Sequence, residues 1–292
     1  MIKTAVFGGS GYIGSHLLKK YRSIYPDCLG TSFQSKNKNL TTFDIRNPNI
    51  DLLKLEQTGH KAAIITSAKP NIAYCEKESS KSYEVNVSGT IQLIKNLSKT
   101  SLKIVFLSSD YVFNGISGNY SDYDKTNPIT AYGKHKKKVE DEISEITDNF
   151  LVLRLSKIYG LKKGDNTILD EAVNTLKQSE QVLAADNQFF CPTFIDDLIN
   201  AIIQIQGKDL KGFINLCAPE SWSRFDMMTL LAQMTNQDTS LVKKIKLYDI
   251  KEMQGRPLNT TMTCKRLNQE VEAKFISLKD AMVKIANNYR NL

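Results

Sequence analysis

Long apolar runs, paired cysteines and clustered histidines are all missing from this sequence of 292 residues. No run of about 18 apolar residues occurs, so we expect no membrane-spanning helix and no membrane partner. The five cysteines contain no C-x-x-C pair, which argues against a zinc site or a disulfide framework. The three histidines are dispersed, so we assign no metal. The first residues lack the apolar stretch and cleavage site of a secretory signal, and we expect a cytoplasmic protein.

The excess of positive charge does not identify a partner by itself. The formal net charge is +8, from 39 Lys and Arg against 31 Asp and Glu. The densest basic cluster, residues 134–138, is followed at once by acidic residues 140–145, which is typical of one helix with a mixed charged face. We therefore expect no nucleic-acid partner, and the surplus suits an anionic small substrate.

Short apolar runs alternate with segments of helical periodicity in the first half of the chain. The predicted strands are residues 4–7, 28–33, 41–45, 62–66, 103–107 and 150–155. The predicted helices are residues 13–25, 52–57, 82–98 and 131–146. Nearly continuous apolar strands separated by amphipathic helices predict an α/β fold with a doubly wound parallel sheet.

The alternation weakens in the second half. Helices are predicted at 167–177, 194–206, 223–234 and 277–289, with Ser223 as an N-cap, and strands at 213–217 and 241–248. No repeat or low-complexity linker separates the halves, so any second part should pack closely on the first.

A glycine-rich turn follows the first predicted strand. Gly8-x-x-Gly11-x-x-Gly14 stands between a strand and a helix, the context in which this spacing predicts a dinucleotide site. The glycines allow a tight turn and close approach of a pyrophosphate to the helix N-terminus. The simpler alternative is a tight loop without a ligand. If the turn binds a dinucleotide, we expect residues 1–160 to form an NAD(P)-binding domain, to which residues of about 190–217 return. Residues 161–292 would then form mainly a substrate-binding domain.

The second predicted strand ends without the acidic residue that commonly binds the ribose of NAD. Its polar continuation makes Ser35 and Lys36 candidate contacts to a 2′-phosphate, so NADP is preferred over NAD; the alternative is a solvated loop. Asp44 ends the third strand, where it would meet the adenine amino group or cap a turn.

A serine, a tyrosine and a lysine follow in an order that suits carbonyl chemistry. Ser109 ends the fifth predicted strand, and Tyr132 and Lys136 lie on one face of the next helix. An ammonium group beside a phenol lowers its pKa toward the range of general acid catalysis. Ser109 could hold the reacting carbonyl oxygen. The Tyr-x-x-x-Lys spacing alone is weak evidence for a catalytic site, because most such pairs lie on solvent-exposed faces of helices.

The combined motifs resemble the extended short-chain dehydrogenase/reductase family, and within it the dTDP-4-dehydrorhamnose reductase branch. The matching segments are residues 8–14, 84–90, 108–115, 120–136, 154–160, 192–198 and 256–259. The resemblance implies a Rossmann domain with Ser109, Tyr132 and Lys136 as catalytic residues. It also implies that Lys136 binds the nicotinamide ribose and that the carboxyl-terminal part holds a nucleotide-diphospho-sugar. The expected reaction is NAD(P)H-dependent reduction of a 4-keto group on a nucleotide-activated deoxysugar. A homodimer is possible.

Two sets of binding residues follow from this resemblance and from the positions of the predicted strand ends. The cofactor set is Gly8, Ser10, Gly11, Tyr12, Ile13, Gly14, Ser35, Lys36, Asp44, Ile45, Ser67, Ala68, Lys69, Asn86, Tyr132 and Lys136. The substrate set is Ser109, Asp110, Tyr111, Trp222 and Arg256. Trp222 could instead be a packing anchor, and Arg256 could instead belong to a surface turn.

One dipeptide separates reductases from dehydratases in this family. Sugar-nucleotide dehydratases carry Asp-Glu where this chain has Asp110-Tyr111, and the missing Glu argues for simple reduction. His135, Lys137 and Val139 depart from the family's usual residues on the same helix. Two alternatives remain: an epimerase or dehydratase that recycles NAD, and a non-catalytic NADP-binding regulatory subunit.

Overall fold

A parallel sheet forms the centre of the larger lobe in the computed structural model, which describes residues 1–34 and 37–290. Five strands lie in the order β1-β4-β5-β6-β11. Their bounds are Thr4–Phe7, Ala62–Ile65, Lys103–Ser109, Phe150–Leu155 and Gly212–Leu216. A bridge from Val6 to Gly30 and the parallel pair β2 (Thr31–Ser32) and β3 (Thr41–Thr42) continue the sheet beyond β1. The predicted doubly wound α/β fold is confirmed.

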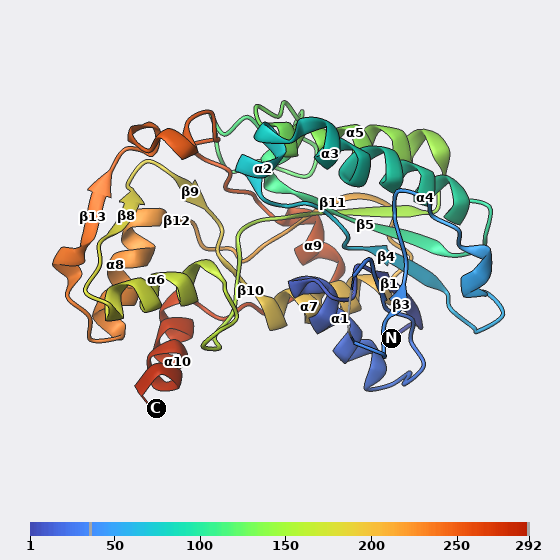
Figure 1. The fold of residues 1–292 in the computed structure, drawn as a ribbon, viewed down its shortest axis with the longest axis horizontal. Helices are drawn as coiled ribbons and strands as arrows, with labels where there is room; N and C mark the ends of the chain where they lie inside the picture. Colours follow the sequence, from blue (N-terminus) through green and yellow to red (C-terminus); the bar gives the residue numbers. More distant parts are fainter. Residues whose placement is uncertain (35–36, 291–292) are drawn as a thin grey trace.

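Helices cover both faces of this sheet (Figure 1). One face carries α1 (Tyr12–Arg22), α7 (Ile195–Gln206) and α9 (Lys265–Glu270), and the other carries α2 (Ile72–Lys77), α3 (Ser79–Tyr83), α4 (Thr90–Leu97) and α5 (Ala131–Ile146). Val6 packs toward α1 and α7, whereas the next residue, Phe7, packs toward α4 and α5. This alternation explains why strands with two buried faces are apolar at nearly every position.

The predicted helix at 82–98 contains a change of helical type. The chain runs through α3, a π-helical stretch at Glu84–Gly89, and α4. The wider turn of a π-helix often occurs at functional sites. Here it contains Asn86, which is buried and turned toward residue 69. Helix α2 was not predicted; its N-cap Asn71 accepts a hydrogen bond from the Tyr74 amide at 2.8 Å.

The second lobe has its own apolar core and lies beside the sheet, at the left of Figure 1. Its main elements are α6 (Ile168–Lys177), β8 (Val182–Ala185), α8 (Arg224–Met234), β13 (Val242–Ile245) and α10 (Leu278–Arg290). Short strand pairs join the lobes: β7 (Ile158–Tyr159) with β10 (Thr193–Phe194), and β9 (Phe189–Phe190) with β12 (Trp222–Ser223). Ser223 caps α8 as predicted, accepting from the Asp226 amide at 3.0 Å.

Several predicted elements are shorter in the structure. The strands expected at 28–33, 41–45 and 241–248 are reduced to β2, β3 and β13, and the helix expected at 52–57 is one 3₁₀ turn, Asp51–Leu53. β2 and β3 lie at the edge of the sheet. A strand at an edge has a neighbour on one side only, so fewer hydrogen bonds support a long strand there. Among the described residues, no helix is long and apolar enough to cross a membrane.

Candidate functional site

The glycine turn connects β1 to α1 with its backbone exposed to a cavity. Gly8 has φ of +101°, and an added Cβ on it would contact Thr66 and Ser67 closely. A Cβ on Gly14 would overlap the carbonyl oxygen of Gly8. Gly11 is the N-cap of α1 and provides no side-chain cap, so the first N–H groups of the helix are left for a ligand.

A cavity of about 500 Å³ opens beside this turn; we call it the glycine-turn cavity. It contains eight of the predicted cofactor residues: Gly8, Ser10, Gly11, Asp44, Ile45, Ser67, Ala68 and Lys69. Asp44 forms an ion pair of 2.7 Å with Arg46, whose guanidinium stacks over the Phe33 ring at 4.9 Å. Arg46 and Lys81 also line the cavity, and sequence reasoning missed both.

Ser35 and Lys36 lie outside the described residues. Asn86, another predicted cofactor residue, does not line the glycine-turn cavity itself. The Asn86 side chain accepts from the Lys69 amide at 2.7 Å and donates to the Lys69 carbonyl at 3.0 Å. Asn86 therefore positions the segment after β4, which forms the cavity wall.

A second cavity, the central cavity, has about 340 Å³ and adjoins the first along Gly11, Thr66 and Ala68. Its lining includes Tyr12, Ile13, Gly14, Ser109, Tyr132 and Lys136, all predicted site residues. Gly133 lets the start of α5 approach the strand end, because a Cβ there would overlap the Tyr111 carbonyl oxygen. Thr130 caps the helix by accepting from the Gly133 amide at 3.1 Å.

Tyr132 keeps its proton in the protein alone. Desolvation raises the pKa of Tyr132 and the charge of Asp110 raises it further, while a hydrogen bond with Ser109 opposes the shift. Lys136 donates to the Leu107 carbonyl at 2.7 Å, and its Nζ lies 5.7 Å from the centre of the Tyr132 ring. The net pKa shift of Tyr132 is therefore upward in the protein alone, opposite to the lowering by Lys136 that we expected from the sequence. The phenol of Tyr132 is thus protonated at neutral pH.

Asp110 is a buried carboxylate held by hydroxyl groups next to Tyr132. It accepts from Thr260 at 2.7 Å, from Ser109 at 3.0 Å and from Ser156 at 3.3 Å. Desolvation raises the pKa of Asp110 to about 6, against these hydrogen bonds. The pKa of Asp110, which lies beside Ser109 and Tyr132, is thus close to neutral pH.

A third cavity, the lobe cavity, lies between the lobes and has about 250 Å³. It shares Ser109, Tyr132, Ser156 and Ile158 with the central cavity, so the three cavities are continuous. The predicted substrate residues Asp110, Tyr111 and Arg256 line it. Trp222 does not line it: its indole donates to Glu220 at 2.9 Å and it packs on the second core, which matches the packing alternative.

Sequence reasoning missed several lining residues of the lobe cavity, chiefly Ser156, Lys157, Gln188, Arg224 and Thr260. Ser156 and Lys157 directly follow β6, at the carboxyl edge where parallel sheets bind ligands. The same rule that selected Ser109 could have found them. The other three come from the second lobe, and no local pattern places them here. Within the described chain, no group of three or more His, Cys, Asp or Glu side chains could hold a metal ion.

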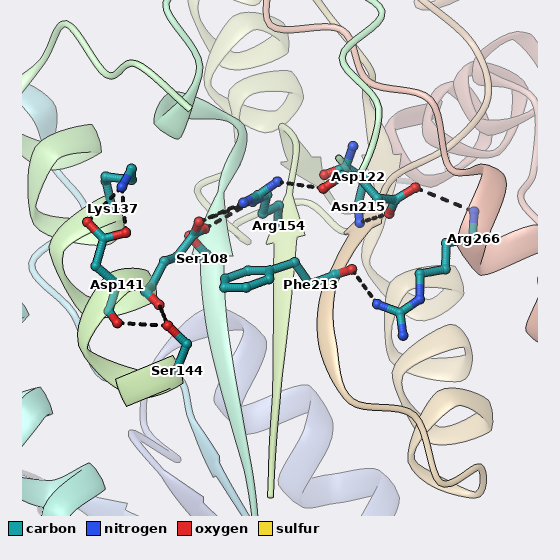
Figure 2. Close-up of polar contacts among 10 residues, drawn as sticks. Ser108, Asp122, Lys137, Asp141, Ser144, Arg154, Phe213, Asn215 and Arg266 are labelled. Atoms are coloured by element: carbon teal, nitrogen blue, oxygen red, sulfur yellow. Dashed lines mark hydrogen bonds and ion pairs between the residues drawn. The ribbon is translucent and has the colours of Figure 1, made fainter. Parts of the chain in front are cut away.

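A buried ionic network holds the strands under the site (Figure 2). Glu140 of α5 accepts from Arg154 of β6 at 2.8 Å and from Ser108 of β5 at 2.6 Å. Arg154 also donates to the Asp122 carbonyl at 3.2 Å, and the Asp122 carboxylate accepts from the Asn215 amide of β11 at 2.7 Å. The network ties α5, which carries Tyr132 and Lys136, to three strands of the sheet.

Comparison with known proteins extends over nearly the whole chain. The model of the family described as RmlD substrate binding domain matches residues 2–291. Methionine adenosyltransferase 2 subunit beta of Xenopus tropicalis is 23% identical, over 91% of this chain and 82% of that protein. dTDP-4-dehydrorhamnose reductase of Aggregatibacter actinomycetemcomitans is 25% identical, over 92% of this chain and 93% of that protein.

Among solved structures, dTDP-4-dehydrorhamnose reductase of Bacillus anthracis, in complex with NADP, superposes with a TM-score of 0.83 over 100% of both chains. The sequences are 20% identical, so this likeness establishes the fold. Because the family model spans residues 2–291, the protein belongs to the RmlD substrate-binding-domain family, and the expected resemblance to the dTDP-4-dehydrorhamnose reductase branch of the extended short-chain dehydrogenases/reductases is confirmed.

Proposed function

We propose that this protein reduces the 4-keto group of a nucleotide-activated sugar with NADPH. One observation carries the proposal: Ser109 and Tyr132 lie where the central cavity meets the lobe cavity, and Lys136 lines the central cavity beside them. A cofactor in the first two cavities and a sugar in the third would meet at these side chains.

The residues at the glycine turn fit a dinucleotide. A Cβ on Gly8 or Gly14 would contact neighbouring atoms too closely, so glycine is needed to keep the turn compact. The first N–H groups of α1 have no side-chain cap and can donate hydrogen bonds to a pyrophosphate. Arg46, Lys69 and Lys81 line the same cavity, and the end of β2 carries no acidic residue, which favours NADP over NAD. Ser35 and Lys36 remain proposed contacts to the 2′-phosphate. Bound NADPH would supply the hydride.

The chain's own residues bind and protonate the keto oxygen. Ser109 donates to Asp110 in the protein alone, and it would turn this hydrogen bond to the keto oxygen of the substrate and orient that oxygen beside Tyr132. Tyr132 then donates its phenolic proton as negative charge develops on the oxygen. Lys136, fixed on the Leu107 carbonyl, holds positive charge near Tyr132 and would bind the nicotinamide ribose.

Tyr132→Phe tests these roles, because it removes the proton donor and keeps the ring. We expect NADPH oxidation with 4-keto nucleotide-sugars to fall about 10²–10⁴-fold, with NADPH affinity unchanged. Tyr123→Phe is the matched control, since Tyr123 is 84% exposed and should keep full activity. Undiminished turnover in Tyr132→Phe would refute the assignment.

A second candidate is a non-catalytic NADP-binding subunit, favoured by the similarity to methionine adenosyltransferase 2 subunit beta. It predicts NADP binding without turnover and a stable complex with a foreign enzyme. The complete Ser109, Tyr132 and Lys136 set beside an open cavity favours the reductase. The proposal includes a cytoplasmic location, which suits the five free cysteines.

A further inference from the structure

Three cationic side chains converge on the lobe cavity from separate parts of the chain. Lys157 follows β6, Arg224 begins α8, and Arg256 lies on the loop before β-bridge residue Asn259. Desolvation lowers the pKa of Lys157, and the nearby charge of Arg224 lowers it further. Within the described chain, no ion pair joins Lys157 or Arg224 to a carboxylate.

The same cavity contains polar atoms that the described protein leaves without partners. The Nε of Arg224 is buried and forms no hydrogen bond. The Oε1 of Gln188 is also buried without a donor, and Gln188 is only 6% exposed. Both residues line the lobe cavity, and buried polar groups nearly always find partners, so a ligand that shifts these side chains slightly would be a suitable partner.

The size of the lobe cavity limits which part of a substrate meets these groups. About 250 Å³ is below the roughly 300–1,000 Å³ of pockets that enclose a whole drug-sized ligand. Because Ser109 and Tyr132 line it, the enclosed part is the reacting sugar rather than the nucleotide. Lys157 lines this cavity and is also exposed to solvent, so it belongs to the open side of the cavity.

We propose that the sugar of the substrate carries its own carboxylate, which Lys157 and Arg224 bind beside the reacting carbon. The inference rests on the proposed nucleotide-sugar reduction and names the substrate class: a nucleotide-activated acidic sugar. Ammonium and guanidinium groups bind a carboxylate through charge-assisted hydrogen bonds. A neutral sugar would bring no counter-charge to Lys157 and Arg224, neither of which forms an ion pair in the described chain. Gln188 accepts from a sugar hydroxyl, and Arg256 remains for the pyrophosphate.

A matched pair of ligands tests the inference by binding alone. Calorimetry with NADP⁺-saturated protein would measure the affinity for UDP-glucuronate and for UDP-glucose, two ligands that differ only at C6 of the sugar. The same comparison would be made with the corresponding pair of thymidine diphosphate sugars. We expect the acidic sugar to bind at least about 10-fold more tightly. Lys157→Gln should weaken binding of the acidic sugar about 10–100-fold and leave the neutral sugar within about 3-fold.

The controls separate this inference from the proposed function. Lys163→Gln removes one exposed lysine outside the cavities and should keep the preference, and Arg224→Gln should reproduce the effect of Lys157→Gln. Unchanged melting temperature and NADP⁺ affinity would establish that the variants fold. Equal affinity of the wild type for both sugars, or an equal loss for both sugars and for UDP, overturns the inference, because the cations then serve the pyrophosphate. Binding of NADP⁺ without any nucleotide-sugar overturns the proposed function itself.

Discussion

The ionisable groups around Tyr132 have pKa values that burial moves toward neutrality. Desolvation lowers the pKa of Lys136 to about 8, although the charge of Glu140 opposes this shift. Desolvation raises the pKa of Asp110 to about 6. Both groups therefore remain mainly charged at pH 7, close to the point where each changes state. Activity should depend on pH on both sides of neutrality.

Asp110→Asn gives a pH-dependent stability test. The folded carboxyl binds its proton more tightly than the unfolded one, whose model value is 3.8. The contribution of Asp110 to the stability of the wild type should therefore fall as pH rises from about 4 to about 6, so the stability of the wild type relative to the variant should fall over this range. Urea denaturation at pH 4.5 and pH 7 measures it. The substitution also alters hydrogen bonds, but that change in the free energy of unfolding is the same at both pH values. If the wild type and Asp110→Asn differ in stability by the same amount at pH 4.5 and at pH 7, the prediction is contradicted.

At the scale of elements, α5 carries both Tyr132 and Lys136 and is held by its buried face. Glu140, 2% exposed, and Arg154, 5% exposed, form an ion pair at 2.8 Å that joins α5 to β6. Such a pair is weak evidence for net stability, but removing one partner leaves the other charge uncompensated. The pair therefore matters chiefly for the position of the helix.

Glu140→Gln should destabilise the fold by about 3–5 kcal/mol, because Arg154 would keep a buried charge without its partner. It should also lower the pKa of Lys136, since the Glu140 charge now raises it. Chemical denaturation and the pH profile of turnover measure the two effects. Glu142→Gln, which breaks only an exposed pair with Lys138 on the same helix, should behave like the wild type. Equal stability of the two variants would show that the buried pair has no such role.

At the scale of the whole molecule, two lobes with separate apolar cores enclose the continuous cavities. The glycine-turn cavity is lined by the sheet lobe, whereas Gln188, Phe190 and Arg224 bring the second lobe into the lobe cavity. The division into a cofactor domain and a mainly substrate-binding part stays a prediction, because it concerns which ligand each lobe binds.

Hydrogen exchange can test that division. NADP⁺ should slow exchange at residues 8–14 and 66–69 and leave β8, α8 and β13 unchanged, since only the first segments line its cavity. A nucleotide-sugar added afterwards should slow exchange at residues 188–190 and 256–260. In Gly14→Ala, where the new Cβ overlaps the Gly8 carbonyl, the NADP⁺ effect should vanish. Equal protection of both lobes by NADP⁺ would contradict the division.

The accuracy of the sequence predictions followed the length and regularity of each element. Helix α5 and strand β6 have the predicted bounds, 131–146 and 150–155, because a long amphipathic helix and a fully buried strand leave clear patterns. Helix α2, Ile72–Lys77, was missed because six residues are too few to show a helical period. The cysteines that look dispersed in sequence include Cys217 and Cys264, whose sulfur atoms lie 3.2 Å apart.

Sequence patterns alone were enough to recognise the glycine turn, the alternation of strands and helices, and the spacing of Tyr132 and Lys136. These features depend on backbone sterics and on side-chain periods within a few residues. Two other features depend on how the chain folds: Lys157, Arg224 and Arg256 share one cavity, and burial raises the pKa of Tyr132. Such convergence and desolvation arise from contacts between distant segments, so no local pattern in the chain records them.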